Sequence, residues 1–153
     1  MRRKDKEITA SAEIRAIIKR ENVCRLAMSD NGTPYLVPLS YGYSQNSLYF
    51  HSASEGKKIG ILKRNPRVCF EIERNLGVIT DDLPCKWGMR FETVIGHGRV
   101  EFITEPDKIM RALNIITGQY GAPAVTEIGP KMVQKMAIFK VVITEVSGKR
   151  MGP

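Results

Sequence analysis

The chain has 153 residues, 42% of them hydrophobic and 26% charged, with a formal net charge of +8 and a pI near 9.6. This length suits one domain over residues 1–153. The charge implies affinity for anions, which would mean an anionic cofactor, nucleic acid or no specific partner, and the scattered cations disfavour nucleic acid. Charges near the N-terminus exclude a signal-peptide core, and no stretch is long enough for a membrane span, so we expect a cytoplasmic protein. The three cysteines include no C-x-x-C pair, which argues against disulfide bonds and a metal site.

The N-terminal part is predicted to contain a flexible tail, a helix and a hairpin. Residues 1–8 form the tail, and the helix that follows ends near residue 20. Residues 23–29 form a strand, and the Asp-Asn-Gly sequence at 30–32 is typical of a tight turn into a partner strand. The apolar face of the helix consists of Ile14, Ile17 and Ile18.

Residues 36–58 are the stretch around which the rest of the chain is organised. Strands are predicted at 36–43 and 47–51, separated by a turn, because both segments are rich in aromatic and aliphatic residues. The loop 52–56 has little side-chain bulk, so its N–H groups can approach a ligand closely. Lys57 and Lys58 follow and open a short helix.

This loop and its lysines have two interpretations. A helix N-terminus preceded by serine and glycine is a natural site for an anion, and we expect a phosphate there. In the alternative, Ser52 or Ser54 caps the helix and the lysines are a solvated first turn. Lysines oppose the helix dipole at this end, which favours the ligand.

The remaining elements are mostly strands. Residues 67–73 alternate cleanly, 74–86 are predicted to form a long loop, and 90–103 form a strand broken at the glycines of 96–98, where we expect a barrel corner. A helix over 104–118 and a final strand over 137–146 complete the pattern, and 148–153 form a second tail. Five or six antiparallel strands with few helices fit a closed or split barrel.

Several stretches together resemble one family. They are Pro-Leu-Ser-Tyr at 38–41, Tyr-Phe-His-Ser-Ala at 49–53, Gly-Lys-Lys at 56–58, the opening residues 1–7 and the segment 87–96. In this order they resemble the pyridoxamine-phosphate-oxidase-like split-barrel flavoproteins, in particular the nitroimidazole-resistance (Nim-type) branch. The resemblance implies a mainly β (α+β) fold, an antiparallel six-stranded split β-barrel with a few peripheral helices.

The resemblance also implies a flavin mononucleotide (FMN) site. Lys57 and Lys58 with Ser52 would hold the phosphate, and a ring needs an apolar slot with polar groups along its edge. The strand residues that would line the ring, with backbone groups on its polar edge, are Pro38, Leu39, Ser40 and Tyr41. The aromatic residues Tyr41, Tyr49 and Phe50 have an alternative interpretation as barrel packing.

Four further residues are candidates for this site: His51 through its position, and three others through the same resemblance. His51, at a strand end beside the phosphate loop, would contact the flavin or the substrate and act as the catalytic proton donor, or it is a structural histidine. Trp87, Arg90 and Glu92 would approach the flavin of a second subunit, which implies a homodimer with flavin at the interface. Arg90 would bind negative charge or form a surface ion pair, and Trp87 would contact the ring or anchor the interface.

The implied activity is that of an FMN-dependent oxidoreductase. Electrons from a nicotinamide donor would reach a small-molecule acceptor such as a nitroaromatic compound. No G-x-G-x-x-G motif indicates a dedicated dinucleotide fold, so NAD(P)H would bind transiently over the flavin. The alternatives are a non-catalytic flavin-binding or sensing protein and, less favoured, a basic nucleic-acid-binding domain.

Overall fold

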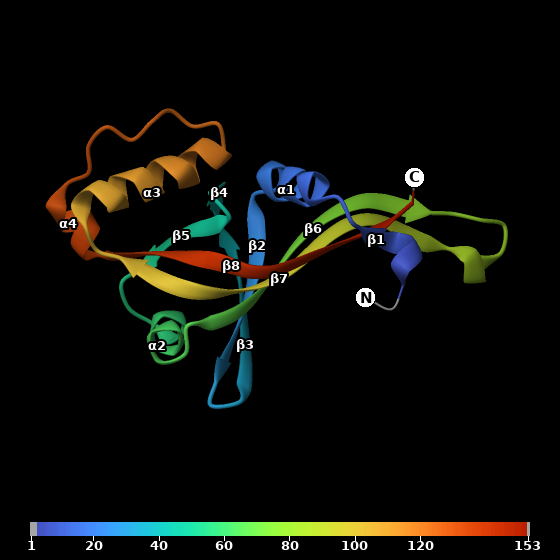
Figure 1. The fold of residues 1–153 in the computed structure, drawn as a ribbon, viewed down its shortest axis with the longest axis horizontal. Coiled ribbons are helices and arrows are strands. Elements are labelled where there is room, and N and C mark those ends of the chain that lie inside the picture. The colour runs from blue at the N-terminus through green and yellow to red at the C-terminus, as the bar shows by residue number, and fades with distance from the viewer. Residues whose placement is uncertain (1–2, 153) are drawn as a thin grey trace.

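The structure is a computed structural model that describes residues 3–152 (Figure 1). The described residues form eight strands, four α-helices and two short 3-10 helices, at Lys4–Lys6 and Pro84–Lys86. The predicted hairpin is confirmed: β2 (Val23–Asp30) pairs with β3 (Thr33–Ser40). Asn31 and Gly32 both have positive φ, at 50° and 88°, as a tight hairpin turn requires.

The strands form one antiparallel sheet in the order β3-β2-β6-β7-β8-β5-β4, with β1 beside β8. Its edge strands, β3 and β4, are joined in sequence by Tyr41 alone, so the sheet must curve until its two edges meet. This is the predicted split barrel, although it has eight strands and not six. The other strands are β1 (Glu7–Ile8), β4 (Gly42–Ser44), β5 (Ser47–Ala53), β6 (Arg67–Ile79), β7 (Gly88–Ile103) and β8 (Met136–Met151).

The barrel interior is filled by alternate residues of these strands. Val68, Phe70 and Ile72 on β6 point inward, as their alternation predicts, while the residues between them face outward. Burial of such side chains supplies most of the driving force for folding. The largest side chains without exposed surface are Tyr41, Phe50, Phe70 and Phe139.

An arm of three strands leaves the barrel. β6, β7 and β8 continue beyond α1 to the right of Figure 1, and the predicted loop 74–86 is wrong for residues 74–79, which belong to β6. The register of β6 against β7 shifts between Asn75 and Gly77, and Gly77 has a φ of 103°. This bulge interrupts the period of two, which hides the strand in the sequence.

The glycines at 96–98 also coincide with an irregular strand. The register of β7 against β8 shifts between His97 and Gly98. A Cβ added at Gly96 would lie 2.7 Å from the Glu145 carbonyl oxygen, so only glycine fits there without movement. The glycines therefore mark a bulge and a close approach of β8.

Four helices cover the sheet. α1 (Ser11–Arg20) lies against β6 and β7 and buries the predicted isoleucines, and α3 (Pro106–Gln119) lies against β4 and β5. α2 (Lys57–Arg64) lies near β2, and α4 (Pro130–Gln134), which was not predicted, lies against β8. Within residues 3–152, no helix combines the length and the apolar character needed to cross a membrane.

Parts of the two predicted flexible tails, Glu7–Ile8 and residues 148–151, are strands. Glu7 pairs with Lys149 and Ile8 with Gly148, which ties β1 to the end of β8. Ile8 is buried, and this burial with the ladder hydrogen bonds explains the order. The tail prediction is therefore wrong for these residues, while residues 1, 2 and 153 lie outside the described part of the chain.

Candidate cofactor site

The N-terminus of α2 is open to a ligand. Gly56 precedes the helix with a φ of 117°, and no side chain of the described residues caps the first N–H groups. The first turn carries no acidic residue. The alternative in which Ser52 or Ser54 caps this helix is therefore wrong, and the positive end of the helix dipole is left for another anion.

Lys57 and Lys58 add two uncompensated positive charges at this point. Neither amine lies within 4.0 Å of a carboxylate oxygen in the part of the chain that the structure describes. Lys57 Nζ instead lies 4.6 Å from the centroid of the Tyr35 ring. Burial lowers the pKa of the half-buried Lys58 below the ordinary lysine value of 10.5. The chemistry of this donor set therefore suits a phosphate.

The loop before α2 is tied down where it leaves β5. Ser52 pairs with Ala137 at the end of β5, and the N–H of Ser54 donates to the Lys135 carbonyl oxygen at 3.1 Å. Ser52 is half-buried beside this loop. The structure therefore holds the loop and the lysines on a rigid strand end, as precise ligand binding requires.

The predicted ring-lining strand is an exposed sheet edge. Among the described strands, β3 pairs with β2 only, so alternate N–H and C=O groups of β3 point away from the sheet. Pro38 and Ser40 are exposed, and Leu39 packs inward against the core. An edge with free backbone groups could contact the polar edge of a flat ring.

Tyr41 contributes no side-chain surface to this edge. Its ring is fully buried, and its hydroxyl donates to the Ile18 carbonyl oxygen at 2.6 Å. Burial raises the pKa of this phenol above its ordinary value. The packing alternative therefore holds for the Tyr41 side chain, and only its backbone remains for a ligand.

The three neighbouring residues of β5 have different surroundings. Phe50 is fully buried and stacks on Phe139 with ring centroids 5.2 Å apart, so its side chain is also core packing. Tyr49 is half-buried in the cluster beneath α3. His51 is exposed and forms no side-chain hydrogen bond with any described residue, so the structural alternative for this histidine has no contact to support it.

The second predicted cluster lies on the arm, away from the first. Pro38 belongs to a cross-strand row that ends at the outward-facing Ile95, whereas Glu92 points to the opposite, inner face. Arg90 is two residues from Glu92 on β7 and shares its face. One subunit therefore does not bring the two clusters together.

Trp87 and Arg90 are available on this arm, and Glu92 is not. Trp87 is 55% exposed, and its indole N–H donates to the Asp81 carbonyl oxygen at 2.7 Å. Arg90 is exposed and forms no ion pair within residues 3–152. Glu92 is only 6% exposed and is paired with arginines of its own chain, so its carboxylate has little surface to offer a ligand, and its contact with a cofactor stays a prediction.

Sequence reasoning missed the partners of these residues. Tyr35 beneath Lys57 and the arginines around Glu92 come from other elements, and only the register of the strands brings them close. The sequence contained one sign that Glu92 has buried cationic partners. Glu92 is in phase with the inward-facing Val94, and a carboxylate at such a position needs a buried cation.

Comparison with known proteins identifies relatives along nearly the whole chain. The family model described as pyridoxamine 5'-phosphate oxidase matches residues 10–150. A candidate 5-nitroimidazole antibiotic resistance protein of Bacteroides thetaiotaomicron VPI-5482 is 32% identical, with a TM-score of 0.82 over 94% of this chain and 86% of that one.

Two further relatives share less of the sequence. A flavocytochrome of Azotobacter vinelandii is 18% identical, with a TM-score of 0.85 over 100% of this chain and 72% of that one, a similarity of fold. An uncharacterized protein of Rhizobium meliloti (strain 1021) is 32% identical over 65 residues, which span 42% of each chain.

Proposed function

This chain belongs to the pyridoxamine 5'-phosphate oxidase family, and we propose that it is an FMN-dependent oxidoreductase that acts on small nitroaromatic compounds. The observation that carries the proposal is the uncapped N-terminus of α2 with two lysines that lack a carboxylate partner among the described residues. An FMN phosphate would supply the missing negative charge. The similarity to the candidate 5-nitroimidazole resistance protein supports the choice of acceptor.

Each part of the chain has a role in this proposal. Lys57 and Lys58 would bind the phosphate, and the free edge of β3 at Pro38 and Ser40 would orient the ring. The flavin, when bound, would supply the two-electron redox chemistry. The exposed His51 would bind the acceptor or hold a proton for it.

We further propose a homodimer with the site at its interface. The outer face of the sheet carries exposed apolar side chains, at 48% for Val23, 56% for Leu36 and 46% for Ile95. Such a face loses contact with water when a second copy covers it. The second copy would also bring Arg90, which lies on the other face of its own sheet, and Trp87, which directly precedes β7, to the ring.

The absorbance spectrum of the purified protein, followed by addition of NADH or NADPH without oxygen, tests the activity. We expect a flavin spectrum that bleaches with the donor and returns when a 5-nitroimidazole is added. A bound flavin that neither donor reduces would favour the non-catalytic binding protein. Colourless protein that takes up no added FMN would contradict the proposal, and salt-sensitive binding of nucleic acid would then favour the basic domain.

A further inference from the structure

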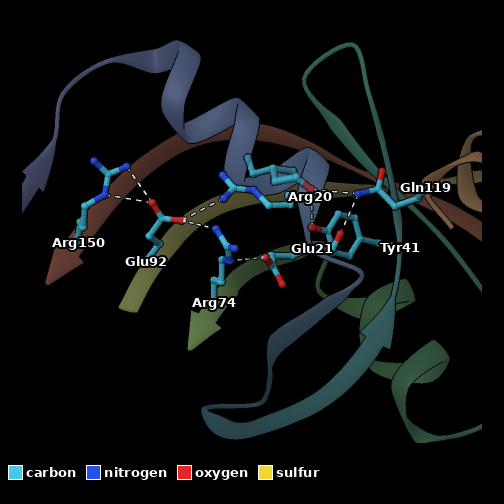
Figure 2. A network of polar contacts seen from close by, with 8 residues as sticks. Arg20, Glu21, Tyr41, Arg74, Glu92, Gln119 and Arg150 are labelled. Carbon is cyan, nitrogen blue, oxygen red and sulfur yellow. Dashed lines mark hydrogen bonds and ion pairs between the residues drawn. The ribbon is translucent and has the colours of Figure 1, made fainter. Parts of the chain in front are cut away.

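Glu92 is a buried carboxylate at the centre of a row of charges. Strand register places it directly between Arg74 on β6 and Arg150 on β8, so the row crosses all three strands of the arm. Opposite charges at directly paired positions attract each other across a sheet. The row lies on the inner face of the arm, beneath α1 (Figure 2).

The two oxygens of Glu92 have different partners. Oε1 accepts hydrogen bonds from Nε and Nη2 of Arg150, at 3.1 and 2.8 Å. Oε2 is buried without a hydrogen bond from any described residue, and Arg20 Nη1 and Arg74 Nη1 each lie 3.7 Å from it. A buried charge is costly unless cations surround it, so Glu92 depends on these three arginines.

Helix α1 is linked to each strand of the arm through the same charges. Arg20 pairs with Glu92 on β7. Glu21, at the end of α1, lies 3.8 Å from Arg74 on β6, and Glu13 lies 3.5 Å from Arg150 on β8. Three arginines thus face three carboxylates, and the balance leaves no surplus positive charge for an external anion.

The C-terminal end of α1 is also held to the barrel. The Tyr41 hydroxyl donates to the Ile18 carbonyl oxygen. The Gln119 amide nitrogen shares its two hydrogens among the carbonyl oxygens of Ile18, Lys19 and Glu21, at 3.1, 3.0 and 2.8 Å. Figure 2 shows Tyr41 and Gln119 beside the end of α1. These bonds satisfy carbonyl groups that a helix end leaves free. The end of α1 therefore connects the barrel to the arm.

We propose that Glu92 is a positioning residue that sets the direction in which the arm leaves the barrel. Glu92 gathers the arginines of α1, β6 and β8 at one point of β7. We call this cluster of Glu92 and its three arginines the joint. Arg90 lies two residues from Glu92 on the same face of β7, so its position depends on the joint. The consequence for ligand binding rests on the proposed function, in which Arg90 meets the flavin held by a second copy.

Three variants of the full chain test the joint without any flavin. Glu92→Gln keeps the shape of the side chain but removes its charge, and Glu92→Asp keeps the charge. Glu101→Gln is the matched control, because Glu101 lies on the same strand in one exposed pair with Lys140 at 3.0 Å. We expect Glu92→Gln to lower the thermal midpoint by about 10 °C, Glu92→Asp to recover part of this, and Glu101→Gln to change it by about 2 °C or less.

Titrations with FMN and with riboflavin distinguish an effect on the position of Arg90 from a loss of stability. They are carried out at a temperature well below the thermal midpoint of every variant. We expect Glu92→Gln to weaken both ligands by the same factor, because the arm would act on the ring and not on the phosphate. The double variant Arg90→Ala with Glu92→Gln should bind riboflavin no more weakly than Arg90→Ala alone. Glu92→Asp should restore part of the affinity.

Each other result overturns a defined part of the proposal. An unchanged midpoint in Glu92→Gln overturns the joint itself. A lower midpoint with unchanged affinity for both ligands overturns the positioning role. A wild-type chain that binds neither ligand overturns the proposed function and with it the positioning role, while the midpoints still decide whether Glu92 joins α1 to the arm.

Discussion

Two groups of cations in this molecule have opposite surroundings. At α2, Lys57 and Lys58 lie at the positive end of a helix without a carboxylate within 4.0 Å among the described residues. On the arm, Arg20, Arg74 and Arg150 surround the buried Glu92 and are balanced by two further carboxylates. The first group is free to bind an anion from outside the chain, and the second already has one within it.

The difference shows that positive charge alone does not locate a ligand. The formal charge of +8 is spread over the whole chain, and the arginine group contains three cations, one more than the lysine group. What separates the two is compensation, because a satisfied cation gains little from a new anion while an unsatisfied one gains a charge-assisted hydrogen bond.

Removing both Lys57 and Lys58 should reduce FMN affinity more than any other change. Because a hydrogen bond to a charged group contributes about 1.5–3 kcal/mol, Lys57→Ala with Lys58→Ala should weaken FMN by about a hundredfold or more and leave riboflavin unchanged. Fluorescence titration measures both affinities. Lys63→Ala, in the last turn of the same helix, is the control and should leave FMN binding unaltered. Equal FMN affinity in the double variant would place the phosphate elsewhere.

The protonation of Lys58 should give FMN binding a pH dependence. Burial lowers the pKa of Lys58, so its charge is lost at a lower pH than in an ordinary lysine as the pH rises. FMN affinity should then fall with rising pH below 10.5, by about tenfold for the loss of one charged partner. Lys58→Arg stays protonated and should flatten the profile measured from pH 7 to 10. Identical profiles for the two proteins would exclude Lys58 as the titrating group.

Salt should distinguish the lysines at the N-terminus of α2 from the buried Glu92. Raising NaCl from about 50 to 500 mM shortens the screening length severalfold, so FMN affinity should fall by about fivefold. The thermal midpoint of the flavin-free protein should respond much less, since Glu92 is buried. Titration and thermal unfolding at both salt concentrations provide the test. FMN binding that is indifferent to salt would contradict a phosphate held by ammonium groups.

Loss of the contact between Lys57 and the Tyr35 ring should change FMN affinity least. An exposed cation–π contact contributes about 0.5–1 kcal/mol, so Tyr35→Leu should weaken FMN by about twofold to fivefold. Tyr35→Phe keeps the ring and should bind FMN as the wild type does. Tighter binding in Tyr35→Leu would instead mean that the ring competes with the phosphate for Lys57.

Local patterns in the sequence predict most of the barrel. The prediction of the hairpin turn at 30–32 is confirmed, because Asn31 and Gly32 adopt the positive φ that the turn requires. The prediction of β6 is confirmed where its buried and outward-facing residues alternate. The arm was missed because the bulge at Asn75 and Gly77 breaks that alternation. The ordered ends were missed because pairing of β1 with β8 joins the two ends of the chain.

The candidate site was predictable only in part, for a related reason. A glycine before two lysines marks the open end of α2 within a few residues. Tyr41 and Phe50 could not be assigned, because an aromatic side chain suits a core as well as a ring, and the structure places both in the core. The burial of Glu92 could not be predicted, because the three arginines around it lie on other elements.

The affinities of the wild-type chain for FMN and for riboflavin, measured side by side, test the site at α2 most directly. The two ligands differ only in the phosphate, which Lys57 and Lys58 are proposed to bind. FMN should bind about a hundredfold more tightly than riboflavin. Equal affinities, or no binding of either ligand, would contradict a phosphate site at the N-terminus of α2.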